Sequence, residues 1–67
     1  MDQNDVVRKN ITKFRIEKDY TQERLAYESE ISKGYLSEIE SGKKSPTIRT
    51  MVKLSKTLEV ELYKFFK

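Results

Sequence analysis

The sequence predicts a small all-α domain, and three observations support this fold class. Residues that break helices are scarce, because the 67 residues contain only two glycines and one proline. Residues with high helix propensity, such as Glu, Lys, Leu and Arg, are abundant. Apolar residues recur at spacings of three and four rather than in alternation. A chain of this length makes one domain, residues 1–67, and we expect five helices joined by short connections.

The first two helices are placed by their apolar stripes and by one capping residue. The spacing predicts a first helix over residues 4–18, which ends at the Asp19-Tyr20 pair. Thr21 is the expected N-cap of a second helix that ends near Ser29, and Ile31 fills the turn that follows. The side chains predicted to face the core are Val7, Ile11, Phe14, Leu25 and Ala26.

The third helix has a capping residue at each end. Ser32 is the expected N-cap, the helix runs to about residue 41, and Gly42 stands where a left-handed C-cap is expected. Leu36 and Ile39 lie three apart and are predicted to be buried.

The last two helices follow the only proline. Pro46 suits the very start of a fourth helix, which is expected over residues 47–58, and a short final helix covers residues 61–66. The residues expected on the inner face of the fourth helix are Ile48, Met51, Val52, Leu54, Ser55 and Leu58.

The absent residue types limit the chemistry available to the chain. It has no cysteine and no histidine, which excludes disulfides and the usual zinc sites, and we expect no cofactor. No pattern indicates a nucleophile with its base, so an enzyme is not expected. No apolar run is long enough to cross a membrane, and the start MDQNDVVRKN is unlike a secretory signal. These features predict a cytoplasmic protein without a membrane partner.

Positive charge is concentrated in the last third of the chain. Residues 1–22 carry five basic and four acidic side chains, residues 23–42 two and five, and residues 43–67 seven and two. The net charges are therefore +1, −3 and +5, in agreement with the overall +3. Such a cationic segment suits a phosphate backbone, although a solvated helix face has the same composition.

The second and third helices have the arrangement of a helix-turn-helix, two short helices joined by about three residues. In such a unit the second helix presents short polar or basic side chains to base edges in the major groove of DNA. The first helix lies across the DNA backbone and offers its N-terminal N–H groups to a phosphate. Double-stranded DNA is therefore the expected partner.

From Ile11 onward the chain resembles the lambda-repressor-like, XRE-type helix-turn-helix domain. The residues that carry the resemblance are Thr21-Gln22, Leu25-Ala26, Ile31-Ser32, Tyr35-Leu36-Ser37, Ile39-Glu40 and the segment from Gly42 to Pro46. The resemblance implies a compact five-helix fold that contacts DNA through residues 21–41 and the loop after them.

The resemblance also implies which residues contact base edges. Lys33, Gly34 and Glu38 match the principal base-contacting positions, with Ser32 and Ser37 beside them. Lys33 would donate to guanine or else reach only a phosphate, and Gly34 would allow close approach of the helix. Glu38 is repelled by phosphates, so it would bind a cytosine amino group, exclude wrong bases, or remain solvated.

A second set of matching positions is expected to contact the DNA backbone. Gln22 would touch a phosphate and brace the third helix, or simply cap its own helix. Tyr35 would face a phosphate or lie partly in the core. The whole set is Thr21, Gln22, Tyr35, Ser41, Lys43 and Lys44.

Four other positions concern structure. Arg15 and Glu40 match a buried ion pair that ties the first helix to the third. Asp19 and Glu30 stand where the family often has glycine. Because glutamate tolerates the left-handed region less readily than aspartate, the turn before the third helix is expected to be mildly strained or differently shaped.

The last eight residues hold more apolar side chains than a terminal helix usually needs. They either close the core of one chain or form a self-complementary interface, and we expect a homodimer with recognition helices ~34 Å apart. Met51 and Leu54 are expected in the core instead. The expected interface residues are Val60, Leu62, Tyr63, Phe65 and Phe66.

The leading hypothesis is a bacterial or phage-encoded transcriptional regulator that binds a pseudo-palindromic operator as a homodimer. It would be a repressor or a restriction–modification controller protein, and no small-molecule ligand is expected because no ligand domain is evident. An alternative is the antitoxin of a toxin–antitoxin pair, which binds a toxin protein and its own operator. A third possibility is an interaction module that has lost DNA binding, since residues 23–42 are net acidic.

Overall fold

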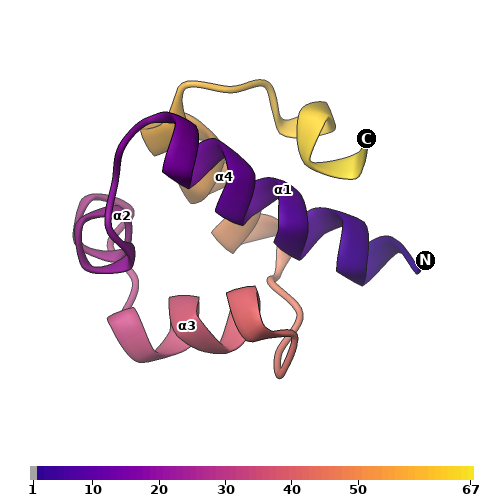
Figure 1. Cartoon of the computed structure of the whole chain (residues 1–67), viewed down its shortest axis with the longest axis horizontal. Helices are drawn as coiled ribbons and strands as arrows, with labels where there is room; N and C mark the ends of the chain where they lie inside the picture. Colours follow the sequence, from indigo (N-terminus) through magenta and orange to yellow (C-terminus); the bar gives the residue numbers. More distant parts are fainter. Residues whose placement is uncertain (1) are drawn as a thin grey trace.

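The chain folds into four α-helices and a short 3-10 helix in a computed structural model that describes residues 2–67 (Figure 1). The elements are α1 (Gln3–Glu17), α2 (Gln22–Glu28), α3 (Lys33–Ser41), α4 (Ile48–Leu58) and the 3-10 helix η1 (Leu62–Phe66). In Figure 1, α1 crosses in front of α4, α3 runs below both, and η1 packs against α1. The described part of the chain contains no strand, so the predicted all-α class is confirmed.

Side-chain caps fix where the helices begin. Thr21, Ser32 and Thr47 each accept a hydrogen bond from the backbone N–H three residues on, at 3.0, 3.0 and 3.1 Å. Gly42 ends α3 in the left-handed conformation, with a φ of 89°. Each N-cap of this kind contributes about 1 kcal/mol to stability. The caps predicted at Thr21, Ser32 and Gly42 are confirmed.

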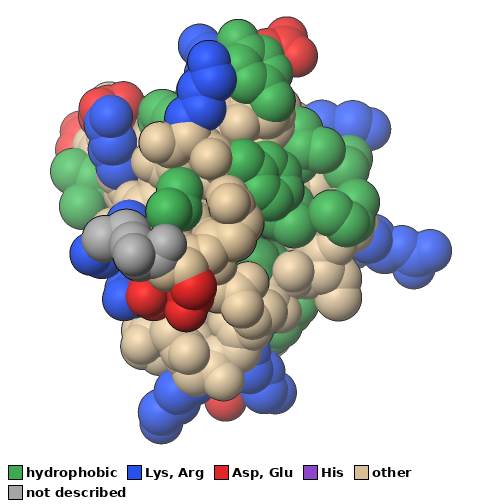
Figure 2. Space-filling view, turned by 90° about the vertical axis from the view of Figure 1, so that its right-hand side faces the viewer, with side chains coloured by type: hydrophobic (Ala, Val, Ile, Leu, Met, Phe, Trp, Pro, Cys, Tyr) green, Lys and Arg blue, Asp and Glu red, His purple; other side chains and the backbone are tan. Residues whose placement is uncertain are grey.

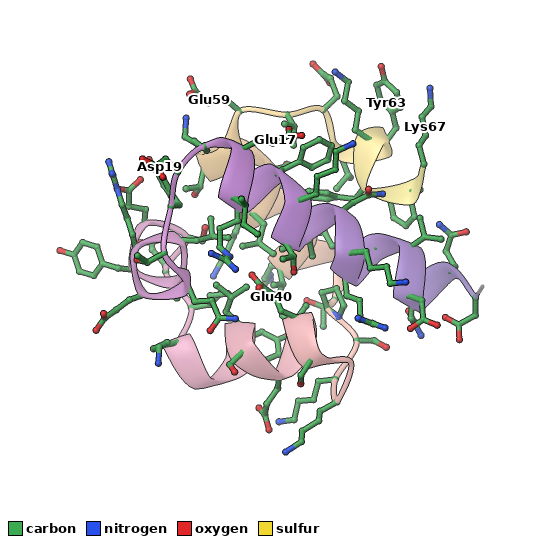
Figure 3. The ribbon with its side chains drawn as sticks, in the orientation of Figure 1. Glu17, Asp19, Glu40, Glu59, Tyr63 and Lys67 are labelled. Atoms are coloured by element: carbon green, nitrogen blue, oxygen red, sulfur yellow. The ribbon has the colours of Figure 1, made fainter. Side chains whose placement is uncertain are left out.

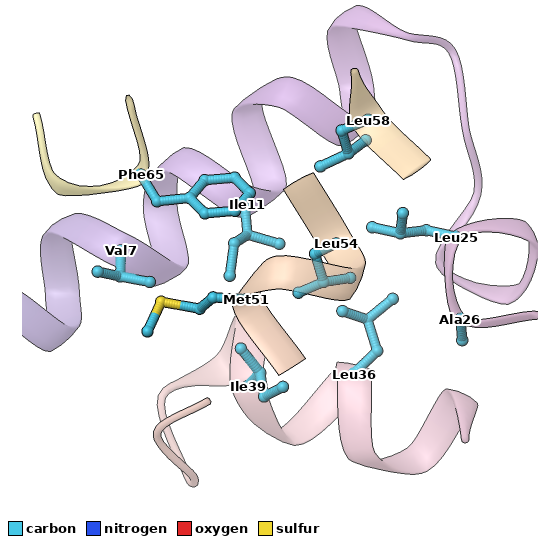
Figure 4. Packing of buried hydrophobic residues seen from close by; sticks show 10 residues of the cluster. All are labelled: Val7, Ile11, Leu25, Ala26, Leu36, Ile39, Met51, Leu54, Leu58 and Phe65. Carbon is cyan, nitrogen blue, oxygen red and sulfur yellow. The ribbon is translucent and has the colours of Figure 1, made fainter. Parts of the chain in front are cut away.

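All five helices contribute to one hydrophobic core (Figure 4). Burial of one such aliphatic or aromatic side chain stabilises the fold by about 1.5–3 kcal/mol. Phe14 and Ile31 pack against this core but remain partly exposed. The core residues are Val7, Ile11, Leu25, Ala26, Leu36, Ile39, Met51, Leu54, Leu58 and Phe65.

The start of α4 differs from the prediction. Thr47 is the N-cap, so the helix begins at Ile48, one residue later than predicted, and Pro46 directly precedes the cap. Ile48 is 60% exposed instead of buried. The buried face of α4 is centred on Met51, Leu54 and Leu58, and Ile48 lies at its margin in the first turn.

The short final helix predicted over residues 61–66 is present as the five-residue 3-10 helix η1. The amide of Asn10, on α1, donates to the carbonyls of Lys64 and Phe65 at 3.3 and 2.9 Å, and Gln3 donates to the carbonyl of Phe66 at 3.3 Å. These bonds satisfy carbonyls that a helix end leaves unpaired. They also fasten η1 to a helix more than 50 residues earlier in the sequence.

Three non-glycine residues adopt the left-handed conformation at the ends of helices. Asp19, Glu30 and Glu59 have φ values of 64°, 61° and 58°, and the cost is about 1–2 kcal/mol for each residue. The left-handed conformation of Glu30 agrees with the strain expected in the turn before the third helix, whereas the positive φ of Glu59 was not foreseen. Glu59 accepts a hydrogen bond of 2.6 Å from Lys18, which joins the corner after α1 to the end of α4.

Candidate nucleic-acid interface

The helices α2 and α3 pack against each other across a short turn. The backbone N–H of Ile31 donates to the carbonyl of Ala26 at 3.0 Å, and Glu30 then redirects the chain into α3. Ser29 is buried and donates to Thr57 of α4 at 2.9 Å, a tie that the sequence did not reveal. The turn is therefore held by hydrogen bonds to α2 and to α4.

The helix α3 has one buried side and one open side. Leu36 and Ile39 are fully buried, and the centre of the opposite side is formed by Gly34, Ser37 and Ser41, all exposed. A Cβ atom added at Gly34 would meet no atom within 4 Å. In Figure 1, α3 lies at the lower edge of the molecule, below α1 and α4. It presents small side chains at its centre, so its backbone can approach a flat or grooved surface closely.

Charged residues flank this ridge of small side chains. Lys33 lies exposed in the first turn of α3, next to the exposed cap Ser32. Glu38 lies at the other margin, half-exposed, and its carboxylate is 3.4 Å from the ammonium group of Lys44. The structure therefore brings together on one face all five residues expected to contact bases.

The loop after α3 is wound tightly around one carbonyl group. The backbone N–H groups of Lys43 and Lys44 donate to the carbonyl of Glu38 at 2.9 and 3.1 Å. The hydroxyl of Ser41 donates to the same oxygen at 3.2 Å. A Cβ atom at Gly42 would lie 3.3 Å from the side chain of Arg8, so this turn suits glycine in both conformation and space. Both lysine side chains remain exposed beside α3.

A nearly buried ion pair fixes α3 to α1. The guanidinium of Arg15 donates to both carboxylate oxygens of Glu40, at 2.9 and 3.0 Å, and their side chains are 14% and 6% exposed. Arg15 also donates to the carbonyl of Tyr20 at 2.8 Å. Figure 3 shows the labelled Glu40 directed from α3 toward α1. No buried side-chain polar atom among residues 2–67 lacks a hydrogen-bond partner.

Gln22, in the first turn of α2, also contacts the ion pair between Arg15 and Glu40. Its amide nitrogen donates to Glu40 at 3.1 Å. A glutamine amide carries two N–H donors, so the contact with Glu40 leaves the second one for another acceptor. Gln22 and the exposed cap Thr21 thus lie at the end of α2 whose backbone N–H groups are favourable to anions.

Tyr35 lies partly in the core. It is half-buried, and its hydroxyl lies 3.3 Å from that of Thr50 on α4. Thr50 is buried and had not been assigned a role from the sequence. Tyr35 therefore links α3 to α4 through the hydrogen bond between its hydroxyl and that of Thr50.

The C-terminal aromatic residues divide into two groups. Phe65 is fully buried and packs against Phe14, so its predicted place in a dimer interface is wrong: its side chain closes the core of its own chain. Tyr63 and Phe66 are 54% and 39% exposed, and Val60 and Leu62 are half-buried. Figure 2 views the end of the molecule that carries both chain ends, where hydrophobic side chains gather in the upper half. The ammonium group of Lys67 lies 4.9 Å from the ring centroid of Tyr63.

No helix within residues 2–67 is both long enough and apolar enough to span a membrane. The same residues hold no group of three or more Asp or Glu side chains placed to bind a metal ion.

Known proteins share this sequence pattern. Residues 11–65 match the model of the helix-turn-helix family. The HTH-type transcriptional regulator SlrR of Bacillus subtilis is 46% identical over 54 residues, which cover 79% of this chain and 36% of SlrR. The HTH-type transcriptional regulator y4dJ of Sinorhizobium fredii is 38% identical over 60 residues, 90% of this chain and 78% of y4dJ. The chain thus spans about a third of SlrR and most of y4dJ.

Solved structures share the fold. The restriction-modification controller protein C.Esp1396I superposes with a TM-score of 0.89 at 38% identity, over 98% of this chain and 85% of that one. The N-terminal DNA-binding domain of SinR from Bacillus subtilis superposes with a TM-score of 0.86 at 31% identity, over 91% and 90%. The family model, the relatives and the fold agree, and the chain belongs to the XRE-type helix-turn-helix family of DNA-binding transcriptional regulators, not to the enzymes.

Proposed function

We propose that the chain binds a pseudo-palindromic operator in double-stranded DNA as a homodimer and regulates transcription there. The observation that carries this proposal is the open side of α3, with Gly34, Ser37 and Ser41 at its centre and Lys33 at its margin. The major groove of DNA is ≈12 Å wide and admits an α-helix, most closely where the side chains are small. The brace between Arg15 and Glu40 would hold α3 rigid in this position.

In this proposal the residues around α3 divide their work. Lys33 donates to the acceptor atoms of a guanine, and Ser32 and Ser37 contact the neighbouring base edges. The phosphate groups are bound by the N-terminus of α2 and by the loop after α3. The backbone-contacting residues are Thr21, Gln22, Ser41, Lys43 and Lys44, with Tyr35 as a secondary contact because its hydroxyl already pairs with Thr50.

The exposed aromatic residues of η1 support the homodimer. Tyr63 and Phe66 lie on one short turn that Asn10 holds in place, with half-buried Val60 and Leu62 nearby. Association of two copies through this surface about a two-fold axis would remove both aromatic rings from water. Two recognition helices in such a dimer would contact DNA half-sites about one helical turn, ~34 Å, apart.

Control of a restriction–modification system is the more specific role that we propose. It is supported by the likeness to C.Esp1396I, which extends over 98% of this chain.

Binding-site selection from a randomised DNA duplex library tests the proposal, combined with sedimentation of the protein alone and with the selected duplex. We expect a selected sequence with two inverted half-sites, and two protein chains on each duplex. Replacement of both Tyr63 and Phe66 by serine should shift the protein to monomers and abolish the preference for paired half-sites. Failure to enrich any sequence at low salt would overturn the DNA-binding role, and a single unpaired site bound by one chain would overturn the homodimer.

A further inference from the structure

We infer that Glu38 selects a cytosine at one operator position, and that Lys44 exchanges between Glu38 and a DNA phosphate when that cytosine is present. This inference rests on the proposed function and names the base that one residue recognises. It starts from the ion pair at the margin of α3, where the carboxylate of Glu38 lies 3.4 Å from the ammonium group of Lys44.

The ion pair is built so that it can be broken at little cost. The two side chains are 41% and 58% exposed, and ion pairs with such exposure contribute little to stability. The loop does not depend on the pair, because the backbone N–H of Lys44 also donates to the carbonyl of Glu38 at 3.1 Å. The side chain of Lys44 can therefore leave the carboxylate while the backbone of the loop stays fixed to α3.

The carboxylate of Glu38 restricts which base can lie beside it. An ionised carboxylate only accepts hydrogen bonds. In the major groove, cytosine presents an amino donor, whereas guanine and thymine present acceptor oxygens that would repel the carboxylate. Adenine also has an amino group, but its neighbouring N7 is an acceptor. Cytosine is therefore the base that best satisfies Glu38.

The contribution of Lys44 to binding depends on whether the cytosine is present. On DNA without the cytosine, Glu38 keeps Lys44 as its partner, because the unpaired carboxylate would otherwise face phosphates of like charge. On DNA with the cytosine, the amino group pairs with Glu38 and Lys44 becomes available to a phosphate. The lysine thus contributes more to binding of the cognate sequence than to binding of random DNA.

The variants Glu38→Gln, Glu38→Ala and Lys44→Met test this mechanism, with Glu17→Gln as the matched control. Glu17 is exposed at the end of α1, on the side of the molecule opposite α3 (Figure 3). All four variants are first compared with the wild type by thermal unfolding, which shows whether they fold. The wild-type operator is then obtained by selection from a randomised duplex, and each variant is titrated with the selected duplex, with single-base substitutions of it and with a random duplex.

Glu38→Gln should move the preference at one position from cytosine to adenine, because a glutamine amide pairs with the N6 and N7 atoms of adenine. Glu38→Ala should abolish the preference there, which we expect to be on the order of ten- to a hundred-fold in affinity. Lys44→Met should weaken binding of the selected duplex by about five- to ten-fold and binding of the random duplex by about two-fold or less. Glu17→Gln should retain the wild-type preference.

Two results would overturn the inference alone: a wild-type preference that survives in Glu38→Ala, or an equal loss of affinity for both duplexes in Lys44→Met. If the wild type selects no sequence, the proposed function fails and the inference fails with it. The two failures are therefore distinguishable in one set of titrations.

Discussion

Gly34 shows how the absence of a side chain can define an interface. A Cβ atom at this position would meet nothing within 4 Å, and the residue has helical backbone conformation, so the fold itself gives no reason for glycine. Glycine inside a helix is roughly 0.5–1 kcal/mol less favourable than alanine. Its position at the centre of the open side of α3 accounts for it, because a bare backbone can approach a base pair closely.

The variant Gly34→Ala is expected to separate stability from DNA binding. The fold should gain up to ~0.5–1 kcal/mol in free energy of unfolding, since alanine favours the helix. Affinity for the selected duplex should fall because the added methyl group meets DNA. Urea unfolding and DNA titration of the same preparation measure both quantities. A variant that is more stable and binds DNA as tightly as the wild type would show that no close approach occurs at Gly34.

Glu30 carries strain that glycine would relieve. Its φ of 61° costs about 1–2 kcal/mol. A glycine at this position would avoid that cost, but its greater flexibility in the unfolded chain would offset part of the gain. We expect Glu30→Gly to raise the free energy of unfolding by ~0.5–1 kcal/mol, or the melting temperature by ~3–6 °C. Glu30→Gln is the control, because it removes the charge and keeps the strain. An equal rise in melting temperature for both variants would assign the effect to charge rather than to backbone conformation.

At the scale of the helices, the sequence predicts most of what local interactions decide. The caps Thr21, Ser32 and Gly42 act within four residues, so the bounds of α2 and α3 follow from them. The character of the last helix does not, because it depends on the amide of Asn10, 54 and 55 residues away. The burial of Phe65 could not be predicted either, since a row of apolar residues does not reveal which side chain turns into the core.

The resemblance predicts the ion pair between Arg15 and Glu40, and its near-complete burial means that removal of one partner should destabilise the fold measurably. Glu40→Leu should leave Arg15 nearly buried without a charge partner and lower the free energy of unfolding by about 3 kcal/mol or more. The total stability of so small a domain rarely exceeds about 3–5 kcal/mol, so this variant should be largely unfolded. The double variant Arg15→Met with Glu40→Leu should recover most of the loss. Circular dichroism during urea unfolding checks both, and a double variant no more stable than the single one would contradict a penalty from the unpaired charge.

At the scale of the whole molecule, ion pairs hold corners of the chain that are far apart in sequence. The hydrogen bond that Lys18 donates to Glu59 lowers the pKa of Glu59 below its ordinary value and raises the pKa of Lys18 above its own. The pair therefore stabilises the fold above the ordinary glutamate pKa, about 4.3, and this contribution disappears as the pH falls through the lower folded value. It also disappears as the pH rises through the raised pKa of Lys18.

Acid unfolding of Glu59→Gln tests this tie, because glutamine keeps the left-handed conformation and cannot lose a charge. The wild type should be the more stable protein near neutral pH, and the difference in melting temperature should shrink as the pH falls below about 4. Added salt should reduce the difference as well, since Glu59 is exposed and Lys18 is only partly buried. A difference that stays constant from pH 7 to pH 3 would mean that the ion pair is not its source.

The central claim is that Lys33, at the margin of the open side of α3, selects sequence, whereas Lys43, in the loop after α3, binds DNA of any sequence. Lys33→Ala and Lys43→Ala, each titrated with the selected duplex and with a random duplex, test it most directly. We expect Lys33→Ala to lose ~1–3 kcal/mol on the selected duplex and much less on the random one, and Lys43→Ala to lose the same amount on both. Equal losses on the two duplexes for both variants would contradict this division between sequence selection and general binding.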